Sequence, residues 1–235
     1  AMRTPGSATG RVAARLAMLL ALCALLGTGA ASAADPRKVF RDVFPAAETG
    51  FDPAAASDLY SAGVMRAIFE TLYTYDYLAR PVKLVPQVAD GMPTIADDGR
   101  TYTVRLAKGI RFAADPAFGG KPRELTADDV VYSYKRVADP RIRSPFAFLI
   151  DGKFVGLDAE VAAARKSGRF DYDRKVAGLE VVDRYTVRFR LTRTDYNLPY
   201  VLAHEALSIV AREVVEKYAE VDGRVHGNPV GTGPY

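Results

Sequence analysis

Few side chains in this sequence could carry out acid–base or nucleophilic chemistry. The chain has two histidines, His204 and His226, and one cysteine, Cys23. The histidines lie far apart in the sequence and neither belongs to a cluster with metal-ligand spacing, so both are interpreted as ordinary surface or loop residues. No G-x-S-x-G nucleophile pattern and no phosphate-binding P-loop is present. The pattern favours binding over catalysis, and we expect no cofactor, no metal and no catalytic residue.

Two pairs of adjacent carboxylates are the remaining candidates for catalysis. Asp97 and Asp98 stand in a predicted turn, and Asp128 and Asp129 stand where a helix is predicted to begin. Adjacent residues point apart, so neither pair can share a proton or act as the two carboxylates of a glycosidase. An exported hydrolase is therefore the weaker alternative to a binding protein.

Two further patterns are interpreted as structural. Gly231 and Gly233 flank a threonine near the end of the chain but lack the lysine and the following helix of a phosphate-binding loop, so a tight turn is the better interpretation. Arg188 and Arg190 alternate with apolar residues along a predicted strand, and Arg193 stands beside them. Such a basic row is more often a solvated sheet face than a binding site.

Composition excludes several classes of protein. The chain has 235 residues, 49% of them hydrophobic and 26% charged, which is typical of a folded domain and not of a disordered or multi-span membrane protein. The net charge is +4, but the first 34 residues contribute three arginines and no acid. The remainder is nearly neutral, so charge gives no reason to expect a nucleic acid partner.

The N-terminus has the pattern of a secretory signal peptide. Three arginines lead into the apolar run Leu16–Leu26, and the small-residue site Ala31–Ala33 follows. The run is too short to span a bilayer, which needs about 20 apolar residues. We expect residues 1–33 to be cleaved and residues 34–235 to be exported to the periplasm. A buried N-terminal helix, or a lipid anchor on Cys23, is the less favoured alternative.

The first elements of the body are predicted as a strand and a helix. Val39–Phe44 has apolar residues on both faces, as in a strand buried inside a sheet. A helix is predicted to begin after Ser57 or Asp58, either of which can cap it, and to run to about Tyr73. Its predicted core face is formed by Val64, Ile68 and Leu72.

The middle of the chain contains the clearest patterns. Thr101–Leu106 alternates strictly between apolar and polar residues, which predicts a strand buried on one face. A helix is predicted to begin at Thr126, whose hydroxyl can cap it, with two carboxylates at the positive end of the helix dipole. Pro140 should end this helix. Its predicted apolar stripe is formed by Val130, Val131, Tyr134 and Val137.

The second half of the body is predicted as an excursion followed by a hairpin. An alanine-rich helical patch lies around Asp158–Arg165. Leu179–Val182 and Tyr185–Leu191 have the pattern of two strands joined by a turn. Arg212–Glu220 is predicted to be the last helix. Together, these elements predict an α/β fold with mixed sheets.

Six segments in collinear order resemble family 5 of the extracellular solute-binding proteins, the oligopeptide- and dipeptide-binding type that serves ABC importers. The segments are Phe51–Pro53, Ile68–Leu72, Asp97–Leu106, Lys108–Phe112, Leu125–Ser133 and Asn228–Tyr235. The most diagnostic is Leu125–Ser133, which reads LTADDVVYS. One departure is the longer loop Ala113–Gly120. The resemblance extends over nearly all of the chain after residue 33.

The resemblance implies a periplasmic-binding-protein-like (type II) bilobal fold. Family members are more than twice as long as residues 34–235, so we expect this chain to be a truncated N-terminal part with only the first lobe and its extra subdomain. The implied function is the periplasmic substrate-binding component of an ABC importer. It would capture peptides or a similar small solute and deliver them to a permease in the inner membrane. A ligand sensor that docks a membrane receptor is the alternative.

Two places are implied as ligand contacts by the resemblance. In relatives, the loop that matches Ser57, Asp58, Leu59 and Tyr60 lines the cleft and contacts an extended peptide. The alternative is that Ser57 and Asp58 only cap a helix while Leu59 and Tyr60 pack beneath it. Phe146 stands where oligopeptide-binding relatives have a cleft tyrosine, which keeps the stacking surface and loses the hydroxyl. The alternative for Phe146 is an aromatic of the subdomain core.

Overall fold

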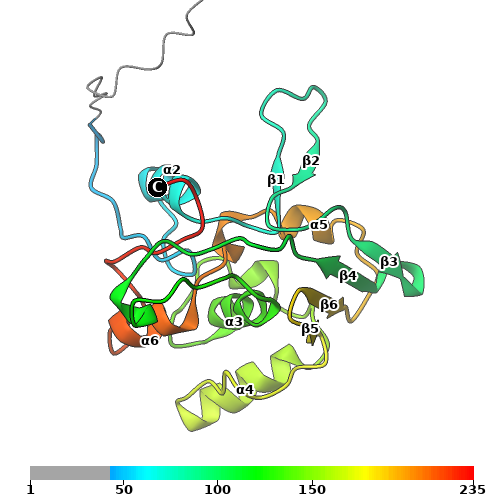
Figure 1. The fold of residues 1–235 in the computed structure, drawn as a ribbon. Coiled ribbons are helices and arrows are strands. Elements are labelled where there is room, and N and C mark those ends of the chain that lie inside the picture. The colour runs from blue at the N-terminus through cyan, green and yellow to red at the C-terminus, as the bar shows by residue number, and fades with distance from the viewer. Residues whose placement is uncertain (1–42) are drawn as a thin grey trace, which may run out of the picture. The chain divides into compact units, whose positions relative to one another are not determined.

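An antiparallel sheet of four strands, in the order β3-β4-β6-β5, forms the scaffold of the middle of the chain (Figure 1). The structure, a computed structural model, describes residues 43–235. The strands are β3 (Thr94–Ala96), β4 (Thr101–Arg105), β5 (Leu179–Asp183) and β6 (Thr186–Arg190). The central strands β4 and β6 are neighbours in space although helices α3 and α4 separate them in the sequence. The predicted hairpin between Leu179 and Leu191 is confirmed.

The alternation predicted from Thr101 is also confirmed. Tyr102 and Val104 of β4 are buried and pair with Phe189 and Val187 of β6 in the antiparallel register. Their side chains share one face of the sheet, because residues two apart in a strand point the same way. This face forms the main apolar core together with α3.

Among the described residues, five α-helices and four short 3₁₀ turns accompany this sheet and a smaller neighbouring one. The α-helices are α2 (Leu59–Ile68), α3 (Ala127–Ala138), α4 (Leu157–Ser167), α5 (Leu198–Val201) and α6 (Arg212–Tyr218). Single 3₁₀ turns are η1 (Asp97–Gly99), η2 (Pro116–Phe118), η3 (Ala147–Leu149) and η4 (Glu205–Leu207). A separate two-stranded hairpin is formed by β1 (Tyr73–Tyr75) and β2 (Leu84–Pro86) and projects from the body in Figure 1. None of the helices described is long and apolar enough to cross a bilayer.

Helix α3 packs on the sheet as its sequence predicted. Thr126 is the N-cap, and the carboxylate of Asp129 accepts hydrogen bonds from the Thr126 amide at 2.8 Å and from its hydroxyl at 3.1 Å. The predicted apolar stripe is buried, and the ring of Tyr134 stacks on Phe189 with centroids 5.7 Å apart. The helix ends before Pro140 as expected. The helices predicted around Asp158–Arg165 and from Arg212 are also present.

The prediction for α2 is right at its start and wrong at its end. Asp58 caps the helix, but the helix stops at Ile68 and not near Tyr73. The carbonyl of Ile68 accepts a hydrogen bond from the amide of Gly233, so the end of the chain occupies the position of the next helical turn. The buried face is therefore not the predicted one. It is formed by Ser61, Ala62 and Met65.

Two other expectations fail in the described residues, namely the end of the first predicted strand and the mixed sheets. Residues 1–42 lie outside the described part of the chain, and they include the predicted signal peptide and most of the strand predicted over Val39–Phe44. At the described end of that strand, Val43 and Phe44 belong to no strand and are exposed. The Phe44 ring stacks on Tyr60 of α2 instead, at 5.3 Å. In addition, every strand pair described is antiparallel, so mixed sheets are not found there.

A buried ion pair ties the segment before α2 to α3. The guanidinium of Arg136 donates to both carboxylate oxygens of Asp52, at 2.9 and 2.7 Å, and both side chains are nearly inaccessible. Asp52 also accepts from the amides of Ala54 and Val225, and Arg136 donates to the carbonyl of Gly223. Burial alone would raise the pKa of Asp52, but Arg136 and these amides outweigh burial and lower it.

The C-terminal segment joins the same region through backbone contact. A Cβ atom added to Gly231 would lie 1.9 Å from the carbonyl oxygen of Ile68, and one added to Gly233 would lie 2.6 Å from that of Ala67. Neither glycine has a positive φ angle. These glycines therefore allow close approach to α2, which is a more specific reason than the tight turn that the sequence suggested. We call this region, with the Asp52–Arg136 pair, the α2–α3 junction.

Candidate functional site

Asp58 organises the first of the two predicted contact places. Its Oδ1 accepts from the amides of Tyr60 and Ser61 at 3.0 and 2.8 Å, and its Oδ2 accepts from the amide and hydroxyl of Thr49. Hydrogen bonds from Ser61 and Thr49 hold the pKa of Asp58 well below its usual value. Both oxygens already have partners, so Asp58 is suited to position this loop.

The neighbours of Asp58 differ in what they expose. Ser57 and Leu59 are exposed, and Leu59 shows 74% of its surface, which contradicts the alternative that it packs beneath the helix. Tyr60 is half-buried against the ring of Phe44. A protruding apolar side chain beside a rigid helix cap is a feature that a ligand chain could contact.

Phe146 lies in an aromatic group at the second predicted place. Its ring centroid is 4.7 Å from that of His204 and 6.5 Å from that of Phe148. Phe146 is half-buried and does not belong to the apolar core clusters of the described residues, and Phe148 is 68% exposed. The side chain is therefore held in place by its neighbours while part of its surface stays accessible.

The structure links the two places indirectly. His204 caps η4 by accepting from the amide of Ala206, and the next residue, Glu205, accepts from Arg66 in the last turn of α2 at 2.7 and 3.0 Å. No hydrogen bond, ion pair or ring contact among the described residues joins Phe146 directly to residues 57–60. We call residues 57–60 with Phe146 and His204 the α2–Phe146 face.

Sequence reasoning missed His204. Burial lowers its pKa, and Arg66 adds to the effect while Glu205 opposes it. His204 is a half-buried loop residue, as the prediction of a surface or loop residue allowed, and burial favours the neutral form of the imidazole. The sequence did not predict its contact with the ring of Phe146. Nothing local in the sequence pairs it with Phe146, because 57 residues separate the two.

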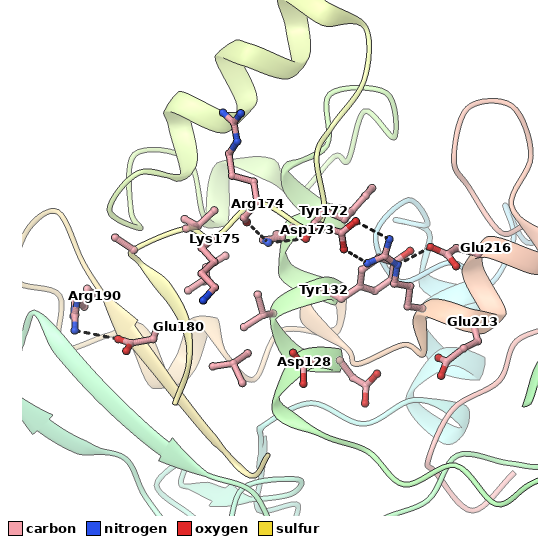
Figure 2. A pocket seen from close by; sticks show the side chains of 18 of the residues that line it. Asp128, Tyr132, Tyr172, Asp173, Arg174, Lys175, Glu180, Arg190, Glu213 and Glu216 are labelled. Carbon is pink, nitrogen blue, oxygen red and sulfur yellow. Dashed lines mark hydrogen bonds and ion pairs between the residues drawn. The ribbon is translucent and has the colours of Figure 1, made fainter. Parts of the chain in front are cut away.

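A cavity of about 800 Å³ lies elsewhere, between α3, α6 and β5 (Figure 2). We call it the charged pocket. Its apolar lining includes Val131, Val176, Leu179 and Val181, and twelve charged side chains stand around these. None of the residues of the α2–Phe146 face lines it. No local pattern in the sequence indicates this pocket, because its walls come from four separate segments.

Two buried charged groups form part of its wall. The ammonium group of Lys135, a residue that is 4% exposed, donates to the carbonyls of Tyr172 and Arg174 at 2.8 and 2.7 Å. Burial lowers the pKa of Lys135, while the more distant carboxylates oppose this. The buried carboxylate of Asp129 is bound by Arg123 at 2.7 Å, and Arg123 also bonds Glu213.

Most other charges of the pocket neutralise one another. Arg212 donates to Asp173 and Glu216 and lies over the ring of Tyr132. Glu180 forms ion pairs with Arg188 and Arg190 of β6, and both arginines are at least partly exposed, as predicted for a solvated sheet face. Arg193 is exposed beyond the end of β6, and Arg190 also lines the pocket.

Lys175 and Asp128 differ from the other charged side chains that line the pocket. Both side chains line the pocket, both are exposed, and neither has a hydrogen bond or ion pair with another described residue. Figure 2 shows Lys175 reaching into the space between β5 and α3, and Asp128 at the start of α3. The adjacent carboxylates Asp128 and Asp129 do point to different surroundings, as predicted.

One group of side chains could in principle hold a metal ion. Oxygen and nitrogen atoms of Glu220, Asp222 and His226 lie within 4.8 Å of one another. Arg224 stands 3.5 Å from Asp222, and Glu220 and His226 are exposed. A guanidinium beside one carboxylate disfavours a further cation there, so these residues are better explained as a surface ion-pair group.

Most of the chain matches a known protein family. The model of the bacterial extracellular solute-binding proteins, family 5 (middle), matches residues 83–235. The glutathione-binding protein GsiB of Salmonella choleraesuis is 28% identical over 215 residues, which is 90% of this chain and 35% of that protein. The di/tripeptide-binding protein 3 of Pseudomonas aeruginosa is 29% identical over 197 residues, 79% of this chain and 32% of that protein.

Solved structures agree with this placement. The Escherichia coli murein tripeptide binding protein MppA matches with a TM-score of 0.61 and 28% identity, over 80% of this chain and 33% of that one. Haemophilus influenzae OppA in complex with the peptide RPPGFSPFR matches with a TM-score of 0.62 over 79% of this chain and 33% of that one. At 24% identity, the second match shows the fold alone. The chain spans about a third of the length of the relatives it matches.

Proposed function

Because the chain belongs to the bacterial extracellular solute-binding proteins of family 5, we propose that it forms part of the peptide-binding component of an ABC importer. The observation that carries this proposal is the family match over residues 83–235. It is supported by relatives named for glutathione, di- and tripeptides, and a murein tripeptide. The fold is that of the peptide-binding type II periplasmic binding proteins, and we infer that this chain holds the start of the first lobe with its extra subdomain.

The α2–Phe146 face is the part of this chain that we assign to the peptide. Asp58 has both carboxylate oxygens occupied, so it holds the loop, while the exposed Leu59 and the accessible part of Phe146 provide apolar contact. The ring of His204 packs against that of Phe146. A peptide lying across such a face is held by its backbone and by apolar contact, which tolerates many sequences.

The remaining assignments follow from the family. We infer export to the periplasm through the signal peptide predicted over residues 1–33, and delivery of the ligand to a membrane permease. No chemical step is required of a carrier, so we expect no catalytic turnover. Incubation of the purified protein with peptide, ester and glycoside substrates should yield no product above the rate in buffer. Hydrolysis that disappears with a single substitution would contradict the binding role.

Peptide binding can be tested on residues 34–235 by ¹H–¹⁵N NMR titration with tetraalanine. We expect saturable shifts centred on Leu59, Phe146 and His204. Phe146→Ala should weaken binding at least about tenfold, which corresponds to about 1.4 kcal/mol. The matched control is Phe148→Ala, which removes a neighbouring exposed ring and should have a smaller effect. Shifts that avoid this face, or equal effects of the two variants, would contradict the assignment.

A further inference from the structure

We propose that the charged pocket between α3, α6 and β5 is a second ligand site, which takes a small zwitterion such as a free amino acid or a di- or tripeptide. The ligand carboxylate would lie at Lys175 and its ammonium group at Asp128. This site shares no residue with the α2–Phe146 face. The inference therefore stands on observations other than those that carry the proposed function.

The pocket has the form of a ligand site. Its volume of about 800 Å³ lies in the range of small-molecule sites. Val131, Val176 and Leu179 provide apolar lining between the charged groups. Ligand sites typically combine such apolar surface with a few polar groups that fix the orientation.

The wall also contains a buried cation with spare hydrogen-bonding capacity. An ammonium group has three donors, and Lys135 uses two of them on the carbonyls of Tyr172 and Arg174. No carboxylate of the described residues forms an ion pair with it, although its side chain is 4% exposed. A buried charge of this kind is costly unless it is compensated, and a ligand carboxylate held at Lys175 would bring a negative charge into the same pocket.

The charged side chains that line the pocket are distributed unequally over its two sides. The side formed by residues 173–180 and Arg190 has three cations and two carboxylates. The side formed by Arg123, α3 and α6 has three cations and four carboxylates. Thus one side has an excess of one positive charge and the other an excess of one negative charge. The groups left without a partner, Lys175 and Asp128, lie on the matching sides.

A zwitterion fits this arrangement better than a simple ion. The twelve lining charges sum to zero, so an anion or a cation alone would bring an uncompensated charge into a partly enclosed space. A ligand with one charge of each sign adds no net charge and can engage both unpaired side chains. Charge-assisted hydrogen bonds of this type are about twice as strong as neutral ones.

The test titrates residues 34–235 with alanine, dialanine and trialanine in turn, and ¹H–¹⁵N NMR spectra monitor binding. We expect saturable shifts of amides in residues 128–135 and 172–181 for at least one member at concentrations up to about 10 mM. N-acetylation or C-terminal amidation of that member should weaken binding at least tenfold, since each removes one charge. Lys175→Met and Asp128→Asn should each do the same.

Controls separate this site from the proposed peptide face. Lys166→Met, an exposed lysine of α4 that does not line the pocket, should leave binding unchanged. Phe146→Ala should also leave these shifts unchanged, even if it abolishes those at the α2–Phe146 face. The proposal is overturned if no shifts occur in the pocket, or if shifts occur there but are insensitive to Lys175→Met and Asp128→Asn. Shifts confined to Leu59 and Phe146 would overturn it as well, while supporting the proposed function.

Discussion

Helix α3 presents two adjacent cations to two different surroundings. Arg136 faces the α2–α3 junction, where Asp52 neutralises it and the Gly223 carbonyl accepts one further hydrogen bond, while its buried Nε has no partner among the described residues. Lys135 faces the charged pocket, where its ammonium group donates to two backbone carbonyls and forms no ion pair with a described carboxylate. Both side chains are nearly inaccessible. In the junction, the two charges are paired within the chain. The pocket stays open, and its lining residues Lys175 and Asp128 have no partner among residues 43–235.

The difference indicates which region serves stability and which can serve binding. Removing either partner of a buried ion pair strongly destabilises the fold, because the other charge is left buried without a partner. Unpaired charges at the mouth of a cavity contribute little to folding and remain available to a ligand. Stability measurements on the two regions should therefore diverge.

The largest effect is expected at Arg136. Arg136→Met should lower the free energy of unfolding by about 3–5 kcal/mol, because Asp52 would be left buried without its cation. Lys135→Met should cost only about 1–2 kcal/mol, since only two carbonyls lose a donor and the pocket can admit water to them. Urea denaturation followed by circular dichroism measures both. Equal losses would mean that the two surroundings do not differ as described.

The pH dependence of stability should come from the same pair. The folded-state pKa of Asp52 is lowered, so its contribution is complete above its unfolded pKa of about 3.9 and is lost as pH falls through the lower folded value. The stability gap between the protein and an Asp52→Asn variant should be constant from pH 5 to 7 and should shrink below about pH 4. A gap that grows on acidification would contradict this sign.

The glycine contact of the junction can be broken separately. Gly231→Ala should cost about 2–3 kcal/mol, because its Cβ would lie 1.9 Å from the Ile68 carbonyl oxygen and the backbone would have to shift. Gly227→Ala is the matched control, since no atom lies within 4 Å of its Cβ position, and it should change stability by less than about 0.5 kcal/mol. Thermal or urea unfolding of the two variants compares them directly.

A smaller effect is expected where α3 begins, between the two regions. Thr126→Ala should lower the free energy of unfolding by about 1 kcal/mol, because the N-cap and its contact with Asp129 are lost. The midpoint of urea denaturation would report this. An unchanged midpoint would show that the helix start does not depend on Thr126.

The smallest effect should be found at the pocket. Lys175→Met should change the free energy of unfolding by less than about 0.5 kcal/mol, because Lys175 is exposed and has no partner among the described residues. The same urea titration measures it. A clear destabilisation would show that Lys175 is part of the folded framework, and would remove the contrast between the two regions.

Local patterns predicted much of the fold. The cap at Thr126, the stripe of α3, the alternation of β4 and the hairpin of β5 and β6 were all read correctly, because each depends on residues a few positions apart. For the α2–Phe146 face, the sequence indicated the cap at Asp58. It did not indicate that Leu59 is exposed or that His204 lies against Phe146.

The wrong predictions for the end of α2 and for the first strand have the same cause. The end of α2 could not be predicted because Gly233, far away in the sequence, donates to the carbonyl of Ile68. The strand expected at Val39–Phe44 is absent where it is described, since the Phe44 ring packs on Tyr60 and not inside a sheet. In both cases a contact between distant segments outweighs a local preference.

The order of segments in the sequence by itself was enough to identify the family and to predict most helices and strands, because such signals are short-range patterns of polarity, caps and turns. The tertiary structure alone decided which charges are satisfied. Asp52 and Arg136 are 84 residues apart, and Lys175 and Asp128 come from different walls of one cavity. Whether a charge is paired depends on distances in space, and those are set by the packing of the whole chain.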